Sequence, residues 1–432
     1  MKFKAVLTFA FLLAAFWHID AQTSAAADKS KTDTTELRRQ TFDIVWKTIN
    51  EKHYDPTFGG VDWAKVRETY EPKAMAAQTD AQFHGVLRQM LNELKLSHFN
   101  IYQTSSPTEA VERGDGIIGV DLKMIDGKVV ISRVEKGSTA ETSGLKTGFS
   151  IEKINGKTVT EILAPLEKSL TEQGQNERVK NLYKEKTLIS ILGGKPDASA
   201  EIEVLNAKNQ PQMFSVKRYA AKSEMSEALG NFPPQEVIFE AKRLDGNVGY
   251  IRFNIWVIPQ MQKIRAAVRE FADAKGIVFD LRGNPGGVGG MAPGVAGLLV
   301  KERTSLGSMK ARETEQKFVV YPQENPFEGK VVVLTDYGSA STSEVFAAGM
   351  QEIGRAEIIG ERSAGAVLPS VFTVLPTKAI FQYVISDYKS PKSILIEKRG
   401  VAPDVEVKQT RQALLEGRDL PLEEAVKRIL NK

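Results

Sequence analysis

The sequence contains no cysteine. This absence excludes thiol nucleophiles, disulfide bridges and cysteine-ligated zinc or iron–sulfur sites, so any covalent nucleophile must be oxygen or nitrogen. The chain also lacks a charge excess, because 58 Lys and Arg stand against 54 Asp and Glu. Since no long run of one sign occurs either, we do not expect a nucleic-acid partner.

Long hydrophobic runs are missing too. The longest, Ala5 to Trp17, is shorter than the roughly 20 residues that a membrane-spanning helix needs. It follows Lys2 and Lys4 and precedes small residues around Ala21, the pattern of an export signal. We predict a signal peptide over 1–21 and an extracytoplasmic protein, periplasmic or secreted, without a membrane span after signal removal. An uncleaved anchor is the alternative.

A chain of 432 residues is too long for one ordinary core, which predicts two or three domains. After a flexible lead over 22–36, helical spacing of apolar residues predicts a helical domain over 37–100. Short strand-like runs with turn residues between them predict a β-rich domain over 114–220. Alternating strands and helices predict an α/β core over 236–408, followed by a C-terminal helix over 409–432.

The segment Gly338 to Glu344 consists of small residues between a buried strand and the start of a helix. Such a turn can expose a hydroxyl group and hold an oxyanion on backbone N–H groups, which makes Ser341 a candidate nucleophile. Ser341 and Glu344 are also spaced as a capping box, so a purely structural role for Ser341 is the alternative.

A second buried strand runs into a glycine-rich turn, Asp280 to Gly287. Glycines allow backbone amides to point at a ligand, which suits an oxyanion hole. An ordinary tight turn is the alternative.

Together these segments resemble the serine peptidase family of the C-terminal processing peptidases and the tricorn core protease. Eight blocks carry the resemblance, in the family's order: Tyr54-Asp55-Pro56 with Val61-Asp62-Trp63, Glu93-Leu94 with Ser97-His98, Gly116 to Val120, Gly144 to Gly148 with Ile154 to Lys157, Asp280 to Gly287, Gly338 to Glu344, Gly354-Arg355-Ala356 with Gly360-Glu361, and Gly400 to Asp404.

The resemblance implies a crotonase-like α/β core, a PDZ-like domain and Ser341 as nucleophile, with Ser339 and Ser343 structural. It implies an oxyanion hole made by the amide of Thr342 with that of Gly286 or Gly287. It also implies a peptide-binding loop whose backbone amides receive a C-terminal carboxylate. This loop comprises Gly116, Ile117, Ile118, Gly119 and Val120.

One departure selects a branch of the family. The processing peptidases activate their serine with a lysine after the Gly-Glu pair, but here Gly360-Glu361 is followed by Arg362 to Val367 without a lysine. The pattern is similar to the tricorn-like branch, which implies a tetrad of Ser341, His98, Glu397 and Ser97. His53 and His84 are expected to have packing or surface roles, and Glu397 could equally be a surface ion-pair residue.

We therefore predict a serine peptidase that acts on peptides or proteins through an acyl-enzyme, with the PDZ-like domain holding the substrate C-terminus and with no metal or other cofactor. A neutral histidine base with an ordinary pKa of about 6.5 predicts loss of activity in mildly acidic solution. The alternatives are a Ser-Lys peptidase that uses another lysine, for example Lys378, and a catalytically silent peptide- or ligand-binding protein of the same fold.

Overall fold

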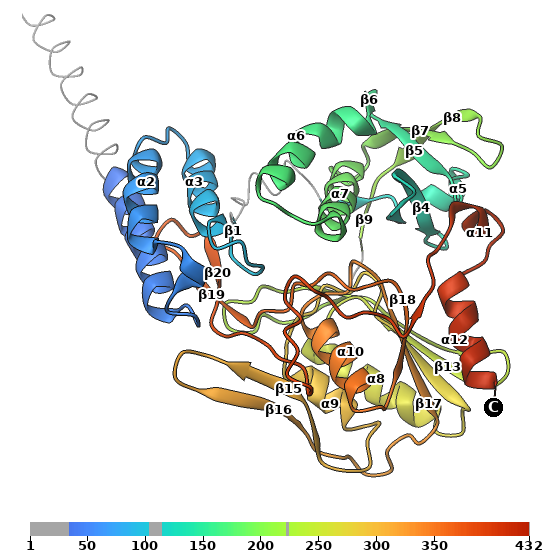
Figure 1. The fold of residues 1–432 in the computed structure, drawn as a ribbon. Coiled ribbons are helices and arrows are strands. Elements are labelled where there is room, and N and C mark those ends of the chain that lie inside the picture. Colours follow the sequence, from blue (N-terminus) through green and yellow to red (C-terminus); the bar gives the residue numbers. More distant parts are fainter. Residues whose placement is uncertain (1–33, 103–114, 222–223, 432) are drawn as a thin grey trace, which may run out of the picture.

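The computed structural model describes residues 34–102, 115–221 and 224–431. These residues form a helical region, a PDZ-like region and an α/β region (Figure 1). No helix among them is long and apolar enough to cross a membrane. The predicted signal peptide over 1–21 lies outside the described residues.

The helical region begins with a helix over 34–52, followed by η1 (Phe58–Gly60), α2 (Trp63–Met75) and α3 (Asp80–Asn92). The chain is thus already helical at 34, although a flexible lead was expected over 22–36. In this helix the Gln40 side chain donates a hydrogen bond to the Glu36 side chain, one turn earlier, at 3.1 Å. Asp62 and Thr79 cap α2 and α3 by accepting backbone N–H groups.

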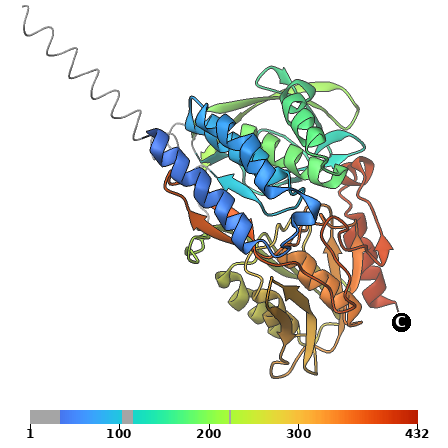
Figure 2. The ribbon, with the colours of Figure 1, turned by 60° about the vertical axis from the view of Figure 1, so that its left-hand side comes forward.

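This region is not built from N-terminal residues alone. Strand β1 (Asn100–Tyr102) pairs with β20 (Ile380–Val384), which pairs with β19 (Ser370–Val374). Both views show this late hairpin, in orange, beside the blue helices (Figures 1 and 2). One hydrophobic core therefore contains Phe83 and Leu87 together with Leu368 and Phe381.

The PDZ-like region contains a sheet with strand order β3-β4-β5-β7-β8. Its strands agree with the sequence pattern, but the region also holds two long helices, α6 (Val159–Glu172) and α7 (Glu177–Leu192), that the pattern did not predict. Helix α7 packs on β3, one of the two edge strands of this order. The elements of the region are β2 (Gly116–Ile117), β3 (Val120–Ile125), β4 (Lys128–Val134), α5 (Thr139–Thr142), β5 (Ser150–Ile154), β6 (Lys157–Thr158), α6, α7, β7 (Ser199–Leu205), β8 (Pro211–Lys217) and β9 (Tyr219–Ala220).

The α/β region is built on a sheet of order β12-β13-β14-β17-β18-β21, parallel except for β12. Its central strands are buried on both faces and accordingly are continuous apolar runs. The elements are β10 (Glu224–Met225), β11 (Glu236–Val237), β12 (Phe239–Leu244), β13 (Val248–Phe253), α8 (Ile258–Glu270), β14 (Gly276–Asp280), α9 (Met291–Ala296), β15 (Thr304–Lys310), β16 (Glu315–Val320), β17 (Lys330–Thr335), α10 (Thr342–Glu352), β18 (Glu357–Gly360), β21 (Val405–Glu406), α11 (Arg411–Leu415) and α12 (Leu420–Leu430).

Successive residues of the central strands serve opposite faces of the sheet. Val331 and Val333 of β17 pack with α8, α9 and α10, while Val332 and Leu334 pack with α12. The sheet is therefore covered by helices on both sides (Figure 1).

The C-terminal segment is two helices rather than the single helix expected over 409–432. Gly417, with φ of 73°, follows α11 and turns the chain. Asp419 then caps α12, and Pro421 occupies its first turn. A glycine in the left-handed region and a new capping residue end one helix and start another.

Candidate active site

The candidate nucleophile Ser341 lies between β17 and the first residue of α10. Its backbone has φ of 54° and ψ of −119°, a conformation that L-amino acids rarely adopt. The Ser341 N–H donates to the carbonyl oxygen of Ala366 at 2.8 Å, which holds the turn in place. A strained strand-to-helix turn of this kind presents a hydroxyl group at the carboxyl end of a sheet.

Glu344 stabilises this turn from within α10. Its buried carboxylate accepts the Ser341 N–H at 3.2 Å, the Gly365 N–H at 2.7 Å, the Ala366 N–H at 2.9 Å and the Ser363 hydroxyl at 2.5 Å. The Glu344 N–H donates to the carbonyl oxygen of Ser341 at 2.8 Å. Glu344 therefore joins the nucleophile turn to residues 363–366, a role beyond the helix cap that its spacing suggested.

The neighbouring serines are buried and bonded. The Ser339 hydroxyl donates to the Leu281 carbonyl oxygen at 2.8 Å, and the Ser343 hydroxyl donates to the Asn284 carbonyl oxygen at 3.1 Å. The Trp256 indole N–H donates to Ser343 at 2.9 Å. Both serines thus attach the nucleophile turn to the glycine-rich loop.

The glycine-rich loop follows β14 and lies against the nucleophile turn, because β14 pairs in parallel with β17. Gly286 has φ of 97°, and a Cβ atom placed on it would lie 2.5 Å from the Cβ of Ser341. Only glycine permits both this backbone conformation and this close approach. Asn284 supports the loop by donating to the Phe253 carbonyl oxygen at 2.8 Å.

The same asparagine distinguishes the two glycines that were expected as alternative oxyanion donors. The Gly286 N–H donates to the Asn284 side-chain oxygen at 3.0 Å. Within the described parts of the chain, neither the Gly287 N–H nor the Thr342 N–H donates a hydrogen bond. The Thr342 hydroxyl donates to the Gly287 carbonyl oxygen at 2.9 Å, which keeps the two residues together. This geometry favours Gly287 over Gly286 as the partner of Thr342.

Three other candidates meet although their segments are far apart in the sequence. The Ser97 hydroxyl lies 2.7 Å from Nδ1 of His98 and donates to Oε2 of Glu397 at 3.0 Å. The Ser97 N–H donates to Oε1 of Glu397 at 2.8 Å. His98 has φ of 60° and directly precedes the Phe99–Asn100 entry into β1, whose pairing with β20 fixes its place. Glu397 therefore holds Ser97, and Ser97 contacts the imidazole ring.

Burial shifts the pKa values of the ionisable groups at this site. It lowers the pKa of His98 to about 4, because the imidazolium ion loses hydration. Burial raises the pKa of Glu397, although hydrogen bonds from Ser97 and Val367 oppose that rise. Burial also raises the pKa of Glu344 to about 7 against its hydrogen bonds. His98 is thus neutral across the physiological range.

One cavity of about 1410 Å³ is lined by Ser341, His98, Ser97, Glu397, Gly286, Gly287 and Thr342. It lies where the three regions meet, since its walls also include Tyr183 of α7, Phe232 before β11 and Phe372 of β19. Its volume exceeds that of ordinary small-molecule pockets and suits an extended peptide. Among the described residues, no group of three or more His, Asp or Glu is arranged to hold a metal ion.

The remaining candidates lie away from this cavity. His53 is stacked between Tyr54 and Phe99, and Nε2 of His84 lies 3.1 Å from the Thr377 hydroxyl. Lys378 is exposed in the turn between β19 and β20 and does not line the cavity. The lysines that do line it are Lys95, Lys186 and Lys398.

The expected carboxylate loop, Gly116 to Val120, is also outside the cavity and joins β2 to β3. The Gly116 N–H is occupied, since it donates to the Gly194 carbonyl oxygen at 2.7 Å. Gly119 has φ of 83° and lies against Ser138, where a Cβ atom would come within 2.3 Å of that side chain. A peptide carboxylate bound by this loop would therefore accept hydrogen bonds from the backbone N–H groups that follow Gly116.

Comparisons with known proteins agree with this architecture. Residues 247–407 match peptidase family S41, residues 35–92 match the tricorn protease C1 domain, and residues 108–180 match the PDZ domain. The carboxyl-terminal-processing protease of Synechocystis is 24% identical over 411 residues, which cover 93% of this chain and 87% of that protein. The putative tricorn protease homolog 2 of Streptomyces coelicolor is 24% identical over 423 residues, covering 90% of this chain and 32% of that protein.

Two solved structures share the fold. The photosystem II D1 C-terminal processing protease matches with a TM-score of 0.57 and 21% identity, over 91% of this chain and 98% of that chain. Mature CPAF matches with a TM-score of 0.64 and 13% identity, over 92% and 97% of the two chains.

Proposed function

Because the chain is a serine-type peptidase of family S41 with a PDZ domain, its substrates are peptides or proteins; we propose that it cleaves them through an acyl-enzyme on Ser341, with His98 as general base. The observation that carries this proposal is the shared cavity. Ser341, His98, Glu397 and the Gly287 and Thr342 amides come from distant segments and line one space.

The hydrogen bonds around Ser97 support Nε2 as the nitrogen of His98 that would act as the base. A hydroxyl group has one proton, and the proton of Ser97 goes to the Glu397 carboxylate at 3.0 Å. The Ser97 oxygen must then accept the proton on Nδ1 of His98, 2.7 Å away. Nε2 of the neutral ring consequently carries the lone pair that can take the Ser341 proton.

The reaction would proceed in two halves. The Ser341 oxygen attacks the peptide carbonyl carbon as its proton passes to His98, and the resulting oxyanion receives the Gly287 and Thr342 N–H groups. His98 then returns the proton to the leaving amine, and water hydrolyses the acyl-enzyme by the same route. Glu397 orients the imidazole and stabilises its charged form through Ser97.

Labelling with a fluorophosphonate probe tests the nucleophile. Wild type should react and folded Ser341→Ala should not; labelling that persists in Ser341→Ala would reject this assignment. Turnover of one peptide substrate tests the base. His98→Ala should abolish turnover, while His84→Ala, which changes a buried histidine outside the cavity, serves as its control.

A lysine base remains the competing mechanism, and the same assay separates it. Near-normal turnover in folded His98→Ala would reject the tetrad. Loss only in Lys378→Ala, or in a variant of the cavity lysines Lys186 or Lys398, would favour a Ser-Lys pair. Glu397→Gln should retain more activity than His98→Ala, because loss of an orienting acid costs less than loss of a base.

We further propose that the PDZ-like region captures substrate C-termini at the amides that follow Gly116. Support comes from the left-handed turn at Gly119, directly before the outer strand β3, since PDZ domains bind peptides by strand addition. Full-length Ser341→Ala should bind a free-acid peptide more tightly than its C-terminal amide. Equal affinities would reject carboxylate capture.

We also propose that the protein acts outside the cytoplasm after removal of residues 1–21, as the basic and apolar N-terminus predicts. N-terminal sequencing of the protein from its native membrane-bounded compartments should find a start near residue 22. An intact Met1 on the mature protein would reject signal cleavage.

A further inference from the structure

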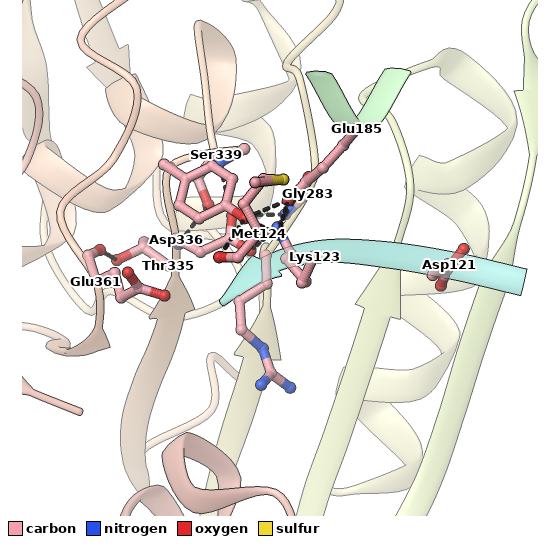
Figure 3. Close-up of polar contacts among 12 residues, drawn as sticks. Asp121, Lys123, Met124, Glu185, Gly283, Thr335, Asp336, Ser339 and Glu361 are labelled. Carbon is pink, nitrogen blue, oxygen red and sulfur yellow. Dashed lines mark hydrogen bonds and ion pairs between the residues drawn. The ribbon is translucent and has the colours of Figure 1, made fainter. Parts of the chain in front are cut away.

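A buried group of charges joins the PDZ-like region to the residues just before the nucleophile turn. The Lys123 ammonium on β3 lies 2.6 Å from Oδ2 of Asp336 and 3.6 Å from Glu185 of α7. Figure 3 shows Lys123 projecting from its strand toward this group. Only 4% of the Asp336 side chain and 22% of the Lys123 side chain are exposed, so water screens the pair weakly.

Asp336 directly follows β17 and holds two loops with its other oxygen. Oδ1 accepts the Gly283 N–H at 2.9 Å and the Gly338 N–H at 2.8 Å. Gly283 opens the glycine-rich loop that leads to Gly287, and Gly338 opens the turn that leads to Ser341. One carboxylate therefore connects the two segments that carry the proposed oxyanion donors and nucleophile.

Asp336 depends on Lys123 for its charge. Burial by itself would raise the pKa of the Asp336 carboxyl, but the Lys123 ammonium and the two backbone donors hold that pKa below its ordinary value. The other ionisable groups that face this pair are Glu185 of α7 and Tyr337 and Glu361 of the α/β region. Lys123 is the single cation among these named groups.

The contact between β3 and the α/β region includes Met124, the residue after Lys123. The Met124 N–H on β3 donates to Glu185 at 2.7 Å and to the Tyr337 hydroxyl at 3.0 Å, and Tyr337 also hydrogen-bonds to Glu185. The Lys123 ammonium lies 4.3 Å from the centre of the Tyr337 ring. Strand β3 thus contacts both Asp336 and Tyr337 on the path to Ser341.

We propose that Lys123 is a positioning residue for the peptidase reaction: its ammonium neutralises and orients Asp336, which keeps the glycine-rich loop and the nucleophile turn in register. The PDZ-like region then completes the geometry of the oxyanion hole in addition to binding substrate. This inference rests on the proposed role of Ser341, which the following experiment tests separately.

The chain offers a matched control. A second ion pair also joins β3 to the α/β region, between Asp121 and Arg252 at 3.3 Å, but 51% of its Asp121 side chain is exposed. Loss of that pair removes one ion pair between the same two regions and leaves Asp336 and its partners unchanged. The variants are therefore Lys123→Met, Lys123→Arg and Asp121→Asn, each checked by circular dichroism and compared with wild type.

The rate at which a fluorophosphonate probe phosphonylates the full-length protein, with fluoride as leaving group, is the first measurement, and kcat and KM for one peptide are the second. We expect Lys123→Met to lower the rate of fluorophosphonate labelling and kcat by about tenfold or more with little change in KM, because an oxyanion donor is displaced. Lys123→Arg should recover part of the loss, and Asp121→Asn should resemble wild type. The Lys123→Met rate should also rise with pH as the uncompensated Asp336 ionises, whereas wild type should not show this step.

A folded Lys123→Met protein that the fluorophosphonate probe labels at the wild-type rate would overturn the inference, as would equal losses in Lys123→Met and Asp121→Asn. If Lys123→Met does not fold, Lys123→Gln replaces it, since glutamine still donates a hydrogen bond but carries no charge. Absence of fluorophosphonate labelling in wild type would instead overturn the proposed role of Ser341.

Discussion

Acid should inactivate the peptidase at a pH set by the burial of His98. An exposed histidine has a pKa of about 6.5, whereas burial lowers the pKa of His98 to about 4. With that value, about 99% of the imidazole is neutral at pH 6, and about half is neutral at pH 4. The loss of activity predicted from sequence for mildly acidic solution is therefore expected at distinctly lower pH.

The same shift predicts how acid affects stability. Because the folded pKa of His98 lies below the unfolded pKa, the unfolded chain binds more protons between about pH 6.5 and 4. The free energy of unfolding should consequently fall as the pH drops through that window, by up to about 3 kcal/mol from this group. His98→Ala should lack this part of the fall, which denaturant titrations at several pH values can measure.

Two assays follow the titration. The imidazole resonances of wild type, with His98→Ala for assignment, report protonation of the ring directly, and kcat/KM against pH reports its effect on the free enzyme. Titration of the ring near pH 6.5 would refute the burial argument, and turnover that survives protonation of the ring would refute its role as the base. A rate loss near pH 7 without protonation of His98 would point to Glu344, whose pKa is raised to about 7.

Three further variants probe the site. Gly286→Ala should lose most activity, because its Cβ atom would lie 2.5 Å from that of Ser341. Gly283 has φ of 72° and no atom within 4 Å of an added Cβ atom, so Gly283→Ala should show backbone strain alone. Equal rates of fluorophosphonate labelling in the two variants would contradict this. Asn284→Ala should lower the free energy of unfolding by about 1 to 3 kcal/mol, as measured in denaturant, since it leaves the Phe253 carbonyl oxygen and the Gly286 N–H unsatisfied. In wild type, the raised pKa of Glu344 should make unfolding free energy fall as the pH rises from about 4.5 to 7, and Glu344→Gln should lack that slope.

The α/β region was largely predictable because its elements are local patterns. Buried parallel strands appear as continuous apolar runs, so the pattern identified β13 (Val248–Phe253) and β17 (Lys330–Thr335). The helix start predicted at the end of Gly338 to Glu344 is that of α10. The β19–β20 hairpin was not predicted, because its residues pack on the N-terminal helices and no local signal reveals that partner.

The helices of the PDZ-like region were missed for a different reason. Pro165 lies inside α6, where a proline usually argues against a helix. The buried residues of α7 include Lys180 and Glu185 beside Leu188 and Leu192, so its inner face has no simple apolar stripe. Their burial becomes understandable only with the ion partners that other elements supply.

The sequence by itself indicated an oxygen nucleophile and a glycine-rich turn, since these depend on residue type and short spacing, and its resemblance to a serine peptidase family implied the Ser97-His98 pair. Only the tertiary structure decided that Ser97, Glu397 and Ser341 line one cavity, and that Gly286 donates to Asn284 while Gly287 does not. It also decided the lowered pKa of His98 and the contact between Lys123 and Asp336. Burial and contacts between distant segments come from the packing of the whole chain, because hydration and electrostatic attraction depend on distances in space rather than along the sequence.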